Sequence, residues 1–530
     1  MSTASVLPAA AQARRRFSLR RVAAWFAARA SDPKSGPWLV ISFAVWHALL
    51  WTLILIRLKA AQDVHMDVAE AFAWGQKFQL GYGKHPPLAG WVAGLWFKVF
   101  PVADWATYLL AMTTLGAGLV ISWLIALRVV DRRRAFFVVV MLAIYPIFNF
   151  KGFKYNPDLL QLVTLPLVVL AYLDAFEKRS VRSGIWLGLA GALALMTKYW
   201  VLTMIGAIGL AALLHPERMK FLRSPAPWVA IITMVVAMIP HLIWLKQVDF
   251  VPLTYAGDVY GLSSRAQSAG LVLGYVGHNL ALLLLPMALA ALALAWPPRF
   301  IGRLWSRGTN PGVDPGQALN IWIIQVIVAI GPPLGGLAFT IYMKTDWGIS
   351  LFFLVPLALV AIPALRLRRI ALFRLTVIWL VLSLATLAAA PAIAVREMED
   401  NPNSAASYGA RSQLARELTE TWHMRFGSPW RVVAGTTEVG EPMTFYSPDH
   451  PAPYTPGEVW SSGLTSLGEA RRLGFIGICD TTDGRLPSCE AWMKDNAANA
   501  EQLVMTTQRF FHGHPGPAIN WKVYIVPPAQ

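Results

Sequence analysis

The sequence is poor in charge for its length. Only 14% of the 530 residues are Asp, Glu, Lys or Arg, whereas 56% are hydrophobic. An average soluble domain has about 25% charged residues, so this chain has too little charge to cover a globule of its size. Apolar runs of the ~17–25 residues that cross a bilayer recur along the chain, for example Trp38–Ile56 and Leu271–Trp296. The composition therefore excludes an ordinary soluble protein and predicts a polytopic membrane protein.

Cysteine is also scarce. The chain has two cysteines, Cys479 and Cys489, both near its C-terminal end. They form no CxxC pair, and no Cys/His spacing typical of a zinc site is present. Two interpretations stay open: a disulfide in an oxidising compartment, or two unpaired buried thiols.

The N-terminal segment is not expected to be a cleavable signal peptide. The segment Arg14–Arg21 is basic, but no short apolar core with a cleavage site follows it. The net charge of +17 comes from basic clusters placed between the apolar runs. Because Lys and Arg gather in the cytoplasmic loops of membrane proteins, this excess favours a membrane topology over nucleic-acid binding.

Six basic clusters set the expected topology. They are Arg14–Arg21, Arg132–Arg134, Lys178–Arg182, Arg218–Arg223, Arg299–Arg307 and Arg366–Arg374. If all six face the cytoplasm, the chain crosses the membrane an even number of times between neighbouring clusters. This parity predicts about eleven helices, near residues 38–57, 104–130, 135–150, 157–174, 183–197, 200–214, 226–245, 269–296, 317–342, 349–364 and 370–393. The odd number places the C-terminal tail outside the cytoplasm.

We therefore expect a mainly α fold with three parts. Residues 1–37 form a basic cytoplasmic N-terminus, and residues 38–394 form the transmembrane domain, with a first outside loop at 58–103. Residues 395–530 are richer in polar residues, Gly and Pro. Helical patterns there alternate with short apolar, β-branched runs, which predicts a small α/β domain. Its expected helices are Leu414–Phe426 and Leu467–Leu473, and its expected strands are Trp430–Ala434, Gly474–Cys479 and Trp521–Val526.

One apolar run is too short for two full crossings. Residues 183–214 lie between two basic clusters, so parity requires a hairpin whose arms have about 15 residues, or roughly 22 Å. The hydrocarbon core is ~30 Å thick, so the tip, with Lys198 and Tyr199, lies below the outer surface. A Lys there either snorkels to the interface or lines a wet cavity that holds an anion.

The first outside loop concentrates acidic residues. Asp63, Asp67 and Glu70 fall within eight residues, and on a helix Asp67 and Glu70 share one face. Lys84 and His85 follow, ahead of a short helix predicted to lie at the membrane interface. This loop is either a site for a sugar, a metal or a general base, or a solvated loop whose charges avoid lipid. A divalent metal would be held by His65, Asp67 and Glu70.

Several short motifs follow one another along nearly the whole chain. They are Asp67-x-x-Glu70, Gly81-Tyr82 with Pro86-Pro87-Leu88 and Trp91, Asn156-Pro-Asp158, Leu195-Met-Thr-Lys198-Tyr199, Pro240-His-Leu-Ile-Trp244 with Asp249-Phe250, Lys344-Thr-Asp-Trp347-Gly348, Trp422-His-Met-Arg-Phe-Gly427 and Phe445-Tyr-Ser-Pro-Asp449. Their order resembles one known family, the GT-C glycosyltransferases that use polyprenyl-phosphate sugars. This family includes the dolichyl-phosphate-mannose protein mannosyltransferases, the aminoarabinose transferase of lipid A and the rhizobial galacturonosyltransferases.

The resemblance implies transfer of a sugar, with inversion, from an undecaprenyl-phosphate donor to lipid A or lipopolysaccharide core, at the periplasmic face of a bacterial inner membrane. It implies that Asp67 is the catalytic carboxylate, assisted by Glu70. Lysines that neutralise the leaving phosphate would stabilise the transition state more than the ground state; the candidates are Lys84, Lys198 and Lys344. Candidate substrate- and acceptor-binding residues are Tyr82, His85, Asp158, Tyr199, Arg265 and Trp347.

The sequence departs from the family pattern at two places. The aminoarabinose-type members have Lys directly before Pro-Pro, where this chain has His85 with Lys84 one residue earlier. The mannosyltransferases commonly follow the first-loop Asp with Glu, where this chain has Val68. Both departures leave the sugar and the acceptor open. The alternatives are protein O-glycosylation and, from another class, a lipid-linked sugar flippase, although no internal repeat typical of transporters is evident.

Overall fold

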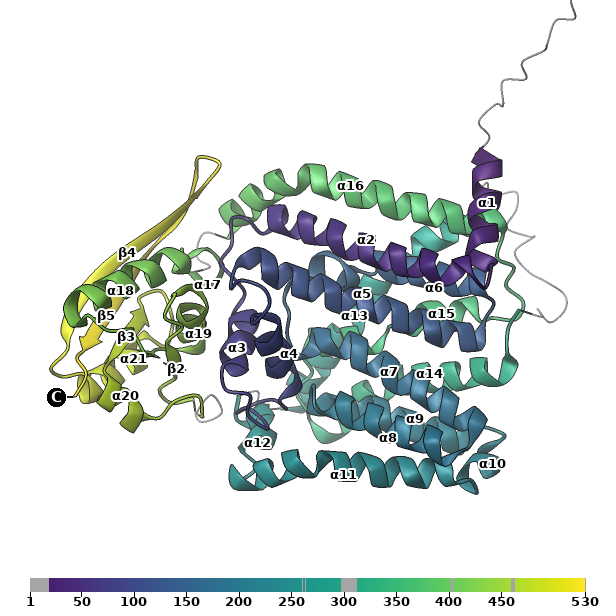
Figure 1. The fold of residues 1–530 in the computed structure, drawn as a ribbon, viewed down its shortest axis with the longest axis horizontal. Helices are drawn as coiled ribbons and strands as arrows, with labels where there is room; N and C mark the ends of the chain where they lie inside the picture. The colour runs from purple at the N-terminus through teal and green to yellow at the C-terminus, as the bar shows by residue number, and fades with distance from the viewer. Residues whose placement is uncertain are drawn as a thin grey trace, which may run out of the picture.

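The computed structural model describes residues 19–259, 261–262, 264–296, 312–401, 405–458 and 463–529. The predicted basic clusters at Arg299–Arg307 and, in part, Arg14–Arg21 lie outside these residues. The described chain forms a bundle of long helices with an α/β domain at one end (Figure 1).

Among the described residues, seven helices are long and apolar enough to cross a membrane. They are α2 (Ser35–Leu58), α5 (Asp104–Val129), α7 (Pro157–Lys178), α11 (Pro225–Gln247), α13 (Arg265–Ala295), α14 (Pro315–Phe339) and α16 (Arg369–Asp400). The predicted short hairpin is present as α8 (Val181–Leu195) and α9 (Leu202–Leu214), joined through the 3-10 turn η3 (Tyr199–Val201). The number of crossings, eleven, stays a prediction.

Two helices expected to be continuous are broken. The helix near 135–150 ends as α6 (Arg132–Ile144), and the chain bends by 80° into the 3-10 turns η1 (Pro146–Phe148) and η2 (Phe150–Phe153). Proline disfavours helical backbone at the residue before it, which explains the break ahead of Pro146. The helix near 349–364 is replaced by a 3-10 segment, η5 (Thr345–Leu351), and the short α15 (Val355–Val360). Irregular backbone at membrane depth is tolerated where protein buries it or it lines a cavity.

The first loop forms a cap between the bundle and the α/β domain. It folds into α3 (Met66–Gly75) and α4 (Leu88–Trp96), and Pro87 is the N-cap residue of α4. The N-terminal helix α1 (Leu19–Ser31) lies at the opposite end of the bundle from this cap (Figure 1). The two short helices α10 (Arg218–Leu222) and α12 (Val251–Val259) complete the helical part.

The C-terminal domain is built on a five-stranded mixed sheet with strand order β2-β1-β3-β5-β4. Strands β2, β1 and β3 are parallel, and β5 runs antiparallel to both β3 and β4. The strands are β1 (Val432–Ala434), β2 (Ala452–Tyr454), β3 (Phe475–Asp480), β4 (Glu501–Phe511) and β5 (His514–Val526), and the helices are α17 (Ala405–Tyr408), α18 (Arg411–Phe426), α19 (Thr437–Tyr446), α20 (Leu467–Leu473) and α21 (Leu486–Asn496). A disulfide joins Cys479 of β3 to Cys489 of α21, with Cα atoms 5.9 Å apart.

The domain docks on the first loop through a buried carboxylate. Asp63 is 4% exposed and accepts hydrogen bonds from the Arg509 guanidinium of β4 and the Arg411 backbone N–H of α18. Helix α19 packs against α3 beside this contact. Helix α3, which carries the candidate site residues Asp67 and Glu70, therefore packs between the bundle and the domain.

Candidate functional site

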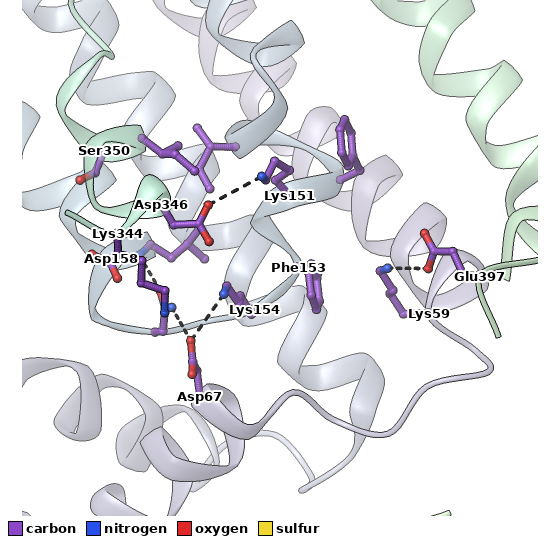
Figure 2. A pocket seen from close by; sticks show the side chains of 15 residues that line it. Lys59, Asp67, Lys151, Phe153, Lys154, Asp158, Lys344, Asp346, Ser350 and Glu397 are labelled. Carbon is purple, nitrogen blue, oxygen red and sulfur yellow. Dashed lines mark hydrogen bonds and ion pairs between the residues drawn. The ribbon is translucent and has the colours of Figure 1, made fainter. Parts of the chain in front are cut away.

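A cavity of about 340 Å³ opens where the cap meets the bundle. Figure 2 shows its lining, in which basic and acidic side chains alternate. Four lysines and four acids contribute: Lys59, Lys151, Lys154, Lys344, Asp67, Asp158, Asp346 and Glu397. The broken segments η1, η2 and η5 supply one wall, so the breaks in the two expected helices create the cavity.

Local sequence signals position the acids at the ends of helices. The Asn156 side chain caps α7 by accepting from the Leu159 N–H at 2.9 Å, and Pro157 occupies the first helical position. Both residue types are favoured at those positions. Asp158 therefore lies in the first turn of α7, near the positive end of the helix dipole. Asp67 lies likewise in the first turn of α3.

Asp67 is held from three sides. The Asn156 amide donates to its Oδ2 at 2.8 Å, and the Lys154 ammonium is 3.7 Å from the same oxygen. Its backbone N–H donates to Nδ1 of His65, the residue that caps α3, at 3.1 Å. The carboxylate thus points into the cavity with a fixed orientation (Figure 2).

The surroundings keep Asp67 ionised. Burial raises the pKa of this carboxyl. The interactions with His65 and Lys154 and the hydrogen bond from Asn156 lower it by more than burial raises it, so the pKa lies well below the ordinary value. Burial also lowers the pKa of His65, so its imidazole is neutral near pH 7. At that pH the Lys154 ammonium and the Asn156 amide are the groups that lower the pKa of Asp67. Asp67 is therefore a permanent anion in the cavity.

Most cavity lysines are paired with acids, but two keep capacity for a ligand. Lys59 forms an ion pair with Glu397 at 2.9 Å, and Lys151 is shared between His278 at 3.2 Å and Asp346 at 3.7 Å. Lys344 is exposed and makes no ion pair within the described ranges. Lys154 has only its 3.7 Å contact with Asp67. Lys344 and Lys154 are thus the cations best placed to meet an anionic ligand.

The predicted lysine Lys198 faces a protein carboxylate. Its ammonium lies 2.8 Å from both oxygens of Asp158 and 5.2 Å from the centre of the Trp347 ring. Lys198 is 8% exposed, so the hairpin tip is buried against α7 rather than reaching toward the interface. Of this pair, Asp158 lines the cavity. Lys198 does not line it and pairs with the Asp158 carboxylate.

Glu70 and Lys84 form a second ion pair, outside the cavity lining. Their atoms approach to 2.5 Å, and Glu70 is 4% exposed. Burial raises the pKa of Glu70 to about 7, because the ammonium of Lys84 only partly offsets burial and the charges of Asp67 and Glu458. Asp67 and Glu70 share α3 as predicted, but Asp67 faces the cavity while Glu70 faces Lys84.

Two further predicted residues, Tyr82 and His85, are buried but do not line this cavity. The Tyr82 hydroxyl donates to the Trp74 carbonyl at 2.7 Å, and the two rings stack. His85 has a buried Nδ1 with no hydrogen-bond partner in the described structure. Burial lowers the pKa of His85 well below its ordinary value, and the neighbouring Lys198 lowers it further. Its imidazole is therefore neutral.

Two more predicted residues lie apart from Asp67. The Tyr199 hydroxyl is 3.1 Å from Nε2 of His241, which links the hairpin tip to α11. Arg265 begins α13, is exposed, and is not among the residues that line the cavity at Asp67. Their roles in substrate binding stay predictions.

The candidate metal ligands do not converge. Nδ1 of His65 faces the Asp67 backbone, and Glu70 turns away to Lys84. Within residues 19–529, less the undescribed gaps, no three His, Cys, Asp or Glu side chains gather in a way that would hold a metal ion. These residues do not fit a divalent metal, and we derive no step through one.

Sequence reasoning missed several cavity residues, chiefly Lys151, Lys154, Asn156 and Glu397. A signal for the lysines was present, because Lys151 and Lys154 lie in an outside turn where the positive-inside rule does not expect basic residues. Nothing in the local pattern marks Glu397, since it reaches the cavity only through the packing of α16.

Comparison with known proteins gives consistent matches. Residues 84–244 match the family model described as dolichyl-phosphate-mannose-protein mannosyltransferase. The lipid A galacturonosyltransferase RgtD of Rhizobium johnstonii is 24% identical over 318 residues, which cover 56% of this chain and 60% of that protein. The crystal structure of ArnT from Cupriavidus metallidurans bound to undecaprenyl phosphate superposes with a TM-score of 0.58 at 12% identity, over 94% of this chain and 100% of that one.

The fold and the charged cavity at the cap define a polytopic membrane protein of the GT-C architecture with a C-terminal α/β domain. The family-model match, the similarity to RgtD and the shared fold all relate the chain to the GT-C glycosyltransferases.

Proposed function

We propose that this protein transfers a sugar from a polyprenyl-phosphate donor to a lipid acceptor of the bacterial cell envelope, such as lipid A or lipopolysaccharide core. The observation that carries the proposal is the cavity itself. An ionised Asp67, with Lys154 beside it at 3.7 Å, shares a cavity of about 340 Å³ with Lys344.

The arrangement suits displacement at the anomeric carbon. The acceptor oxygen forms the new bond to that carbon while the bond to the phosphate oxygen breaks, and the lipid phosphate leaves with the electron pair. Lys344 and Lys154 stabilise the charge that grows on this phosphate. The acceptor hydroxyl becomes strongly acidic as its oxygen forms the bond, so even a carboxylate of low pKa such as Asp67 takes its proton.

The names of the relatives support the substrate classes. ArnT was crystallised with undecaprenyl phosphate, and RgtD is a lipid A galacturonosyltransferase. The cap and the α/β domain lie at the end of the bundle opposite α1 (Figure 1), and the cavity is lined by Asp67 of the cap. We place that end in the periplasm, with the N-terminus in the cytoplasm of a multi-pass inner-membrane protein, because the basic clusters predict this orientation and a disulfide suits an oxidising compartment.

The test is a transfer assay. The purified protein is incubated with lipid A and, in turn, with undecaprenyl-phosphate-linked galacturonic acid, aminoarabinose and mannose, each radiolabelled. We expect label in lipid A from one donor, and a loss of about 10²-fold or more in Asp67→Asn. Asp400→Asn is the matched control, because the Asp400 side chain is 68% exposed at the end of α16 and does not line the cavity at Asp67.

Two results would overturn the proposal. Full activity in Asp67→Asn would show that Asp67 is not the catalytic carboxylate. Absence of transfer from every donor to lipid A would contradict the proposed reaction. Transfer of mannose to a Ser/Thr peptide instead would favour the protein mannosyltransferases, whose family model matches residues 84–244.

A further inference from the structure

A buried histidine lies beside the break that follows α6. His47 is in the middle of α2, a helix long and apolar enough to cross the membrane, and its side chain is fully buried. Nε2 of its imidazole is 2.6 Å from the carbonyl oxygen of Phe148 in η1. On the other side of the ring, the indole N–H of Trp379 in α16 donates to Nδ1 at 3.1 Å. His47 therefore connects α2, η1 and α16, which are far apart in the sequence.

The two partners determine which nitrogen of the ring carries the proton. A carbonyl oxygen only accepts hydrogen bonds and an indole N–H only donates them, so Nε2–H donates to Phe148 and Nδ1 accepts from Trp379. An apolar side chain would fill the same space without needing partners, because only polar groups are costly to bury unpaired. Packing against the neighbouring rings of Phe43 and Trp51 therefore does not by itself account for a histidine at this position.

The carbonyl that His47 binds belongs to backbone that has left the helix. The chain bends by 80° where α6 gives way to η1 and η2, and a break at membrane depth requires new partners for the backbone groups that it frees. Asn149 pairs two of these groups, since its amide donates to the carbonyl oxygens of Ala143 and Tyr145, each at 3.1 Å. The Phe148 carbonyl is paired by His47 of another helix. The bend thus receives a donor from outside its own segment.

The bent segment carries cavity residues directly after the His47 contact. Lys151 lies in η2 and Lys154 follows it, and both line the cavity. Figure 2 shows Lys151 directed toward Asp346 and Lys154 directed toward Asp67, with each ammonium 3.7 Å from the carboxylate. His47 does not line the cavity, so it can act on the site only through the backbone of η1 and η2.

We propose that His47 is a positioning residue for the sugar transfer proposed above. Through the Phe148 carbonyl it fixes η1 and η2 against α2, and thereby fixes the places of Lys151 and Lys154 in the cavity. Trp379 orients the ring, because its N–H keeps Nδ1 turned toward α16. The effect on catalysis rests on the proposed function, whereas the contact between α2 and η1 can be tested without it.

Two substitutions at position 47 separate the hydrogen bond from packing. His47→Leu fills the space and removes the donor, whereas His47→Gln keeps an amide N–H for the Phe148 carbonyl. We expect His47→Leu to raise the donor KM about tenfold, because Lys154, which meets the donor phosphate, is displaced. The acceptor KM should stay unchanged, and His47→Gln should restore most of the donor affinity.

Two further variants complete the comparison. Thr52→Val is the matched control, since Thr52 is also buried in α2 but its hydroxyl donates within the helix, to the Ala48 carbonyl at 2.7 Å. Its donor KM should equal that of the wild type. Trp379→Phe keeps an aromatic ring and removes only the N–H that orients His47, so the donor KM should rise about threefold. This milder variant carries the same comparison if His47→Leu does not fold.

A second readout does not depend on activity. Hydrogen–deuterium exchange of backbone amides measures local opening of a segment. In His47→Leu, exchange in peptides covering residues 145–154 should be about tenfold faster, which is the usual effect of losing one hydrogen bond. Exchange in α18 of the α/β domain should not change, and His47→Gln should exchange like the wild type.

The outcomes are distinct. Unchanged exchange over residues 145–154 in His47→Leu would show that the histidine does not hold the bent segment. Faster exchange with an unchanged donor KM, or a loss in His47→Gln as large as in His47→Leu, would overturn the positioning role. If the wild type transfers no sugar from any donor, the proposed function fails, while the exchange comparison still tests the contact between His47 and Phe148.

Discussion

At the scale of single residues, the orientation of Asp67 depends on an asparagine with two functions. The Asn156 side chain caps α7 through its oxygen and donates to Asp67 through its nitrogen. A serine is also a good helix cap, but it cannot span both contacts. The two functions can therefore be separated by substitution.

We predict that Asn156→Ser lowers kcat by about 10–100-fold, because Asp67 loses its donor and its fixed geometry, while the protein keeps its stability. Asn156→Ala should lower kcat similarly and also reduce the free energy of unfolding by roughly 0.5–2 kcal/mol, the usual cost of a lost cap. Steady-state kinetics and thermal unfolding measure the two effects. Wild-type kcat in Asn156→Ser would contradict the orienting contact.

The sequence could identify the charged residues of the site but not their partners. Asp67, Asp158 and Lys344 were predicted as site residues and all line the cavity. Lys198 was predicted to bind an anion, yet its partner in the structure is a carboxylate 40 residues away in sequence. Which acid meets which lysine is decided by helix packing, and hydrophobic periodicity holds no information about it.

At the scale of elements, the breaks in the helices form the cavity, because the broken segments η1, η2 and η5 line it. Hydropathy alone predicts one continuous helix near 135–150, since the run is apolar throughout. Pro146 was a visible signal for the break, but the 80° bend that follows depends on tertiary contacts. The same limit applies to the α/β domain, where the helix Leu467–Leu473 was predicted with its observed bounds but β4 was missed.

Gly152 makes the bent segment testable. It lies in η2 between the two cavity lysines Lys151 and Lys154, and a Cβ there would come within 2.3 Å of the Ile147 carbonyl oxygen and 2.5 Å of a Leu115 methyl group. We predict that Gly152→Ala displaces η2, weakens donor binding about tenfold and lowers the thermal midpoint.

Gly206→Ala is the control for that substitution. It lies in α9, where an added Cβ would meet no heavy atom within 4 Å, so its donor affinity and midpoint should equal or exceed those of the wild type. An unaltered donor KM in Gly152→Ala would show that the shape of η2 is not required.

At the scale of the whole molecule, the bundle and the α/β domain act as one unit. The domain reaches the cap through Asp63, through α19 and through Tyr446, whose hydroxyl donates to Asp104 at 3.0 Å and accepts from the Val64 N–H at 2.6 Å. Composition predicted the domain, and the basic clusters predicted the side of the membrane on which it lies. The residues that join the domain to the cap are polar and far apart in the sequence. Their pairing arises only when both parts are folded.

The ion pair between Asp63 and Arg509 measures how strongly the two parts are joined. The Asp63 side chain is fully buried and that of Arg509 is 16% exposed. Removing one partner of a buried pair costs about 3–5 kcal/mol, because the other charge is left uncompensated, whereas replacing both costs much less. We predict that Arg509→Met lowers the thermal midpoint, exposes the domain to limited proteolysis and reduces transfer, since the cap then keeps only its contacts with α19 and Tyr446 of the domain. Asp63→Asn with Arg509→Met should be less damaging than the sum of the single changes. Strict additivity of the two would mean that the pair does not join the domain to the cap.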